Sequence, residues 1–185
     1  MNQYAVICLD NNPVSIERIR SELAPLASVF DIYTAENIED AHHALEDIHD
    51  HNQTVALVIT HHHSEFNGVQ FLIELEQLPH SNTARTILVS ASSDIQSILT
   101  AVNEGRLNHC LTKPVQDQVL FKSAQKELTS FVIQYDSENL LSYSDALDQQ
   151  RLFRAHIEQK IHSFQSGFIH DYHQLSDNAL AERVV

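Results

Sequence analysis

The sequence predicts an α/β fold: a five-stranded parallel sheet, doubly wound with helices on both faces, followed by a helical extension. Over about the first 130 residues, apolar runs of strand length alternate five times with segments of helical period. Two of these runs are unbroken, which is typical of parallel strands buried on both faces. We expect the α/β domain to span residues 1–135 and a helical tail to span residues 136–185.

Capping and turn residues separate the predicted elements. Pro13 opens the first helix and Pro25 ends it. Pro114 ends the last strand and starts a long helix, and an earlier helix is predicted to begin at an Asp94 cap and stop at Gly105. The predicted strands are Tyr4–Leu9, 29–34, 55–59, 87–89 and 107–111, and the predicted helices are 13–24, 37–48, 69–75, 94–104 and 114–135.

Polar residues directly follow the predicted strands. Asp10 and Asn11 follow the first strand, Thr60 the third, Ser90 the fourth and Lys113 the fifth. Because the carboxyl ends of parallel strands meet at one edge of the sheet, we expect these side chains to surround one crevice. An acid, a hydroxyl and a lysine around one crevice form an arrangement that suits a phosphate and a cation.

Four segments of the chain, VICLDNNP, VITHHHSEFNGVQFL, ILVSAS and HCLTKP, resemble the receiver domain (CheY-like) of two-component response regulators. The resemblance covers about residues 3–130, and Asn67-Gly68 stands where the family has an Asp-Gly turn. It implies a flavodoxin-like receiver fold and a role in phosphorelay signal transduction. It also implies that Ser90 and Lys113 match the family's phosphoryl-contacting hydroxyl and lysine.

The departures from that family are more informative than the matches. Thr60 stands where the family has its phosphoacceptor aspartate, and Asn11 replaces the second acid that holds Mg²⁺. Of three carboxylates that would face the metal, only Asp10 remains, so we expect Mg²⁺ binding to be weak or absent, and no cofactor. Cys110 replaces the aromatic switch residue. We therefore expect a degenerate pseudo-receiver that acts without phosphorylation and is not an enzyme.

Three consecutive histidines, His61, His62 and His63, follow the third predicted strand. Two of them together with Asp10 could bind Zn²⁺, Ni²⁺ or Cu²⁺, and an imidazole cluster could also sense pH near neutrality. The third interpretation is a solvated loop without a metal, which we favour.

Charge and cysteine content narrow the class of protein. The 185 residues include 25 acids against 11 Lys and Arg, giving a net charge of −14 that disfavours nucleic acids and anionic membranes. Cys8 and Cys110 lie in apolar runs and are expected to be small buried hydrophobes. No basic leader precedes the first strand, and no apolar run approaches the ~18 residues of a membrane span, so we expect a cytoplasmic location.

The tail is expected to hold a helix over 144–165, in which Ile157, Ile161 and Phe164, continued by Phe168, follow a 4-3-4 spacing. That spacing is typical of a short coiled-coil seam. Gly167 is predicted to interrupt the helix, and a last helix would follow. We expect the seam to form a homodimer or to dock a partner; the alternative is that it folds back on its own domain.

The expected function is signal transduction through a protein partner, whether a kinase, a regulator or an output protein. The expected contact surface consists of the helix Ile95–Glu104, the fifth strand and the helix after it. The alternative is an RNA-binding antitermination regulator, in which a pseudo-receiver precedes a small three-helix output domain. The chain lacks the basic-glycine segment of that domain, and its tail is acidic, so we rank this alternative second.

Overall fold

A computed structural model describes residues 2–63, 66–78, 81–91, 95–104 and 107–181, and the side chains as far as residue 165. The strands are β1 (Tyr4–Leu9), β2 (Asp31–Ala35), β3 (Thr54–His62), β4 (Arg85–Ser90) and β5 (His109–Thr112). The α-helices are α1 (Pro13–Leu23), α2 (Ile38–Asp50), α3 (Gly68–Leu75), α4 (Ile95–Glu104), α5 (Val119–Tyr135) and α6 (Gln149–Ala181), and the 3₁₀ helices are η1 (Ala24–Ser28) and η2 (Ser137–Tyr143).

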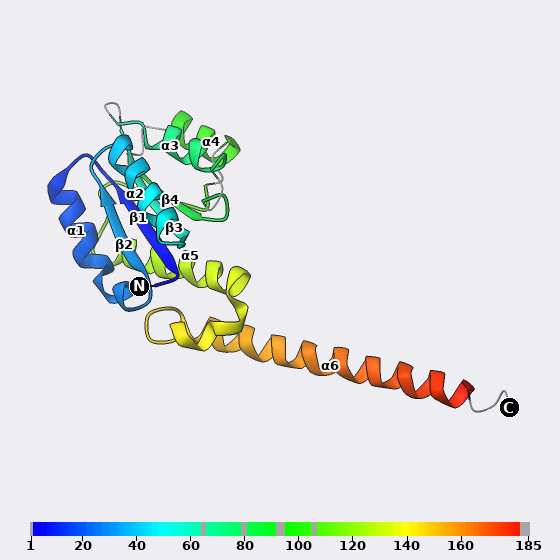
Figure 1. Ribbon diagram of the computed structural model, residues 1–185. Coiled ribbons are helices and arrows are strands. Elements are labelled where there is room, and N and C mark those ends of the chain that lie inside the picture. Colours follow the sequence, from blue (N-terminus) through cyan, green and yellow to red (C-terminus); the bar gives the residue numbers. More distant parts are fainter. Residues whose placement is uncertain (1, 64–65, 79–80, 92–94, 105–106, 182–185) are drawn as a thin grey trace.

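The five strands form one parallel sheet in the order β2-β1-β3-β4-β5, which confirms the predicted fold class (Figure 1). Side chains from α1 and α5 pack on one face of the sheet, and side chains from α2, α3 and α4 pack on the other. All six residues of β1 are buried, as its unbroken apolar run predicts. This arrangement brings the ends of β1, β3 and β5 to one edge of the molecule.

A one-residue irregularity changes the alignment of β3 with β1. Ala5 lies opposite Val55, but Val6 lies opposite Leu57, so Ala56 is an extra residue on β3. An inserted residue moves every following side chain to the other face of the sheet. At the carboxyl ends of the two strands, Leu9 therefore lies opposite Thr60.

Two predicted boundaries are wrong in ways that affect the site. Strand β3 continues to His62 instead of ending at residue 59, because residues 57–62 pair in parallel with β4. Helix α5 begins at Val119 and not at Pro114, because the backbone turns through a left-handed Gln118 (φ 65°) just before the helix. The predicted caps Asp94 and Gly105 lie outside the described residues.

The first part of the predicted tail packs on the α/β body. Leu140, Tyr143 and Leu147 are buried in the same apolar cluster as the side chains of α1 and α5. The Tyr143 hydroxyl donates a hydrogen bond of 2.5 Å to Asp136 Oδ2. The Tyr143 ring stacks on the Phe30 ring, with 5.8 Å between the ring centroids. The segment that joins α5 to α6 is therefore part of the core.

Helix α6 then runs without a break from Gln149 to Ala181 and extends away from the body (Figure 1). The prediction that Gly167 interrupts it is wrong, since one interior glycine costs a helix only about 1 kcal/mol relative to alanine. A single helix also differs from the three-helix output domain that the RNA-binding alternative requires. The predicted contacts of Phe168 lie outside the described side chains. None of the described helices has the length and hydropathy needed to cross a membrane.

Candidate functional site

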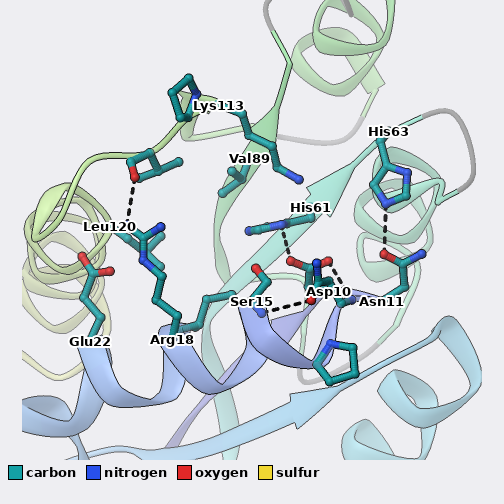
Figure 2. Close-up of a pocket in the computed structure, with 15 residues that line it drawn as sticks. Asp10, Asn11, Ser15, Arg18, Glu22, His61, His63, Val89, Lys113 and Leu120 are labelled. Carbon is teal, nitrogen blue, oxygen red and sulfur yellow. Dashed lines mark hydrogen bonds and ion pairs between the residues drawn. The ribbon is translucent and has the colours of Figure 1, made fainter.

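A cavity of about 810 Å³ opens at the carboxyl ends of β1, β3 and β5, between α1 and the loop that leads into α5 (Figure 2). Its polar rim comes from the strand ends, with Asn11, His63 and Lys113 beside the buried pair of Asp10 and His61. Its apolar wall comes from Ile19, Val89 and Leu120. Helix α1 reaches the cavity at its N-terminus, where the Asn12 side chain accepts hydrogen bonds from the backbone N–H groups of Val14 and Ser15.

Asp10 and His61 contact each other at the base of this rim, between Oδ2 of the carboxylate and Nδ1 of the ring, and form an ion pair when the ring is protonated. Both residues are buried, at 2% and 7% exposed. They meet because Cys8 on β1 and Asp10, just after it, face the same side of the sheet as Ile59 and His61 on β3, once the extra residue has shifted β3. Sequence spacing alone could not find this partnership, because no residue pattern marks the extra residue.

The carboxyl group of Asp10 is held in its ionised form. Burial by itself raises its pKa, but hydrogen bonds from the side chains of His61 and Ser15, the charge of His61 and the backbone N–H of Asn12 at 3.2 Å together lower the pKa below its ordinary value. An ionised carboxylate at Nδ1 fixes the orientation of the imidazole, so the other ring nitrogen, Nε2, faces the cavity (Figure 2).

Thr60 does not line the cavity. Its side chain is fully buried, and its Oγ1 donates a hydrogen bond of 3.2 Å to the carbonyl of His61. Gly68, the first residue of α3, lies so close to the Thr60 hydroxyl and the His61 carbonyl that an added Cβ atom would collide with both. Thr60 therefore packs against the first turn of α3. The residue in the phosphoacceptor position of the sequence comparison is thus directed away from Asp10.

Of the remaining predicted pocket residues, some line the cavity and others do not. Asn11 and Lys113 line the cavity together with Asp10, and Lys113 is exposed. Ser90 is fully buried at the end of β4, opposite His62, and it is not part of the cavity lining. The structure therefore brings Asp10, Asn11 and Lys113 together and separates them from Thr60 and Ser90.

The three histidines have different environments, and the interpretation of a solvated loop is wrong for His61, which is buried in β3. His63 hydrogen bonds through Nε2 to Asn11 Oδ1 at 3.0 Å, and its ring stacks on Phe66. His62 alternates to the other face of the strand and does not line the cavity. Over the described parts of the chain, no three His, Cys, Asp or Glu side chains are placed to hold one metal ion.

The residues at the strand ends also do not fit the Mg²⁺ site of a receiver domain. Such a site needs several oxygen ligands around one cation. Asp10 is engaged with His61, Asn11 with His63, and Thr60 is directed away from the cavity.

Three long-range hydrogen bonds join the two elements on either side of the cavity. Arg18 of α1 donates from Nη2 to the Val115 carbonyl at 2.9 Å and to Asp117 Oδ1 at 3.0 Å. Glu22 Oε1 accepts a hydrogen bond of 3.2 Å from the backbone N–H of Phe121. These contacts join α1 to the start of α5, and nothing in their sequence positions indicates that they meet.

Neither cysteine has the environment of a reactive thiol. Burial raises the pKa of Cys8 to about 12, with a smaller opposing effect of Arg20. Burial also raises the pKa of Cys110, which lies partly buried in β5. Both side chains therefore remain thiols near neutral pH.

Two helices each carry a row of exposed large apolar side chains. On α6 they are Phe153, Ile157, Ile161 and Phe164, with exposures from 41% to 80%; we call this set the α6 stripe. On α4 they are Ile95, Leu99 and Val102, with exposures from 48% to 63%; we call this set the α4 stripe. Both sets recur every three or four residues and so lie along one side of their helix.

No protein-family model matches the chain, and no characterised protein matches it in sequence. Among solved structures, it is similar to the signal receiver domain of an HD domain-containing protein from Pseudomonas fluorescens Pf-5, with 24% identity and a TM-score of 0.59 over 74% of this chain and 94% of that one. A CheY-like response regulator receiver domain from Methanospirillum hungatei JF-1 gives 13% identity and a TM-score of 0.59 over 72% and 99% of the two chains. An adenylate cyclase structure from Rhodopirellula baltica gives 15% identity and a TM-score of 0.60 over 77% of this chain and 98% of that one. The α/β part of the chain thus has the fold of response regulator receiver domains.

Proposed function

We propose that this protein is a phosphorylation-independent pseudo-receiver that acts in signal transduction through protein–protein contacts. One observation carries the proposal: Thr60, at the phosphoacceptor position, is a buried alcohol directed toward α3, while His61 binds the carboxylate of Asp10. An acyl phosphate needs an accessible carboxylate, and the side chain at this position supplies none. The role in signalling rests on the shared fold with receiver domains.

The contact surfaces in this proposal are the two apolar stripes. The α4 stripe lies on the helix that packs beside α3, and it receives the protein partner, whose class is a kinase, a regulator or an output protein. The α6 stripe associates with the same stripe of a second copy, because its 4-3 spacing at Ile157, Ile161 and Phe164 is self-complementary in a two-helix seam. Because α6 extends beyond the body, a second copy can approach it without meeting the α/β domain (Figure 1).

The test of phosphorylation independence is incubation with acetyl phosphate and Mg²⁺, followed by intact-mass spectrometry. We expect no mass increase of one phosphoryl group, whereas a functional receiver domain treated in parallel gains one. Stoichiometric phosphorylation of any residue that lines the cavity would contradict the proposal.

The test of partner contact is a comparison of three tagged proteins in extract of the native cell. We expect the Leu99→Glu variant to lose a protein that the wild type retains, and the variant Val14→Glu, at an exposed apolar residue of α1, to retain it. Recovery of the same proteins by all three would show that the α4 stripe is not the contact surface.

A further inference from the structure

We propose that the cavity beside Asp10 and His61 binds a small monoanionic ligand, a carboxylate with an apolar body. Its carboxylate meets Nε2 of His61 and the Lys113 ammonium, and its apolar part lies against Val89, Ile19 and Leu120. This site differs from a receiver's phosphorylation site, which is built on an acceptor carboxylate and a metal ion. The proposal is independent of phosphorylation and of both apolar stripes.

The size of the cavity indicates a small molecule. A volume of about 810 Å³ lies within the ~300–1,000 Å³ typical of small-ligand sites. Ile19 and Leu120 form an apolar patch between α1 and α5, beside Arg18 and Glu22, and the strand ends supply a separate polar group of residues. An apolar patch and a polar end in one cavity suit a ligand with one polar end and one apolar end.

The buried imidazole is the observation that points to an anion. His61 is 93% removed from solvent, since 7% of it is exposed, and Asp10 holds its Nδ1. Nε2 is directed into the cavity, and the Lys113 side chain extends toward the same space from the residue after β5 (Figure 2). Two nitrogen groups that converge on one space can bind an oxyanion by charge-assisted hydrogen bonds.

The charges around the cavity favour one negative charge over two. Lys113 and Arg18 are the cations of the lining, and Asp10 and Glu22 are its anions. Arg18 is already bound to Asp117, and Asp10 is already bound to His61. Glu22 accepts a hydrogen bond from the backbone N–H of Phe121. Lys113 therefore supplies the positive charge that faces the ligand, in a protein whose net charge is −14. A phosphate dianion would remain partly uncompensated.

Binding couples to a proton. With the carboxylate of Asp10 at Nδ1–H, a neutral ring presents a lone pair at Nε2, which repels a ligand carboxylate. Protonation of Nε2 turns that lone pair into a donor. The other charged or titratable groups that face this space are His63 just after β3, Lys113 just after β5, and Arg18 and Glu22 on α1. The ligand carboxylate therefore selects the form of His61 that carries a proton on both ring nitrogens, whose charge Asp10 balances.

The test uses benzoate as the probe, with methyl and amide NMR shifts and titration calorimetry on the full chain. We expect saturable binding that shifts the signals of Val89, Ile19 and Leu120. Acetate, which lacks the apolar body, and benzamide, which lacks the charge, should each bind at least about tenfold more weakly. Inorganic phosphate that binds more tightly than benzoate would overturn the monoanion assignment, and absence of saturation would overturn the site.

Two variants and their matched controls separate the named contacts from general effects. Lys113→Ala, an exposed change that leaves the core intact, should weaken benzoate about tenfold, whereas Lys122→Ala on α5 should not. His61→Gln should weaken benzoate about tenfold, whereas the exposed His43→Gln should not. Unchanged affinity in Lys113→Ala, or in a folded His61→Gln, would contradict the proposal.

Discussion

Arg85 at the start of β4 donates two hydrogen bonds to Glu127 on α5, from Nε at 3.1 Å and from Nη2 at 2.8 Å. The Glu127 side chain is 3% exposed, so its charge is almost entirely removed from water. This pair attaches α5, and with it one wall of the cavity, to the sheet. The removal of one partner leaves a buried charge without compensation.

Replacement of Arg85 by Met should therefore destabilise the protein by about 3 kcal/mol, because it isolates the Glu127 carboxylate. The double variant Arg85→Met/Glu127→Met should recover most of that loss. The measurement is urea unfolding monitored by circular dichroism. A single variant as stable as the wild type would show that Glu127 finds another partner.

The Asp10–His61 pair predicts a specific pH dependence. The pKa of Asp10 in the folded protein lies below its ordinary value of 3.8, so between those two pH values the unfolded chain binds more protons. Asp10 therefore contributes stability that is complete above about pH 4 and is lost as pH falls through the folded pKa. We expect Asp10→Asn to be less stable than the wild type at pH 6, with a difference that shrinks toward pH 3.

Thermal unfolding from pH 3 to pH 6 checks this prediction. The control is Asp50→Asn, an exposed change at the end of α2, which should leave the curve of stability against pH almost unchanged. Parallel curves for the wild type and Asp10→Asn would contradict the role given to the pair.

An aspartate at position 60 should not restore phosphorylation. Thr60 packs against Gly68 away from the cavity, so Thr60→Asp buries an unpaired carboxylate and destabilises the fold by several kcal/mol, roughly. Thr60→Val, which keeps the shape and loses one hydrogen bond, should cost only about 1 kcal/mol. The measurements are unfolding free energy and intact mass after acetyl phosphate treatment. A stable, phosphorylated Thr60→Asp protein would show that residue 60 can reach the cavity.

Self-association through the α6 stripe predicts a change of mass in solution. We expect the wild type to sediment as a dimer and the Ile161→Glu/Phe164→Glu variant as a monomer, because two charges in an apolar seam prevent its closure. Lys160→Glu places the same side chain at an exposed position beside the stripe and should remain dimeric. The measurement is sedimentation velocity at several protein concentrations. A monomeric wild type would refute self-association through α6.

The fold could be predicted because the alternation of apolar strand runs and amphipathic segments is visible in the order of the residues along the chain. Only some of the residues that line the cavity could be predicted, because the pairing of β3 with β1 decides which side chains of β3 face it. Ala56 is an ordinary residue in an apolar run, yet as an extra residue it exchanges the faces of Thr60 and His61. The length of β3 was missed because polar histidines resemble a loop in sequence, and only pairing with β4 makes them a strand.

The core position of Leu140, Tyr143 and Leu147 bears on how this protein should be divided for experiments. A truncation at residue 135 would remove the residues that cover Phe30 and the inner side of α5, and would leave that apolar surface in water. A shortened chain that keeps this apolar surface covered therefore has to extend past Leu152, which is also fully buried. A fusion or deletion designed to isolate α6 should cut beyond that residue.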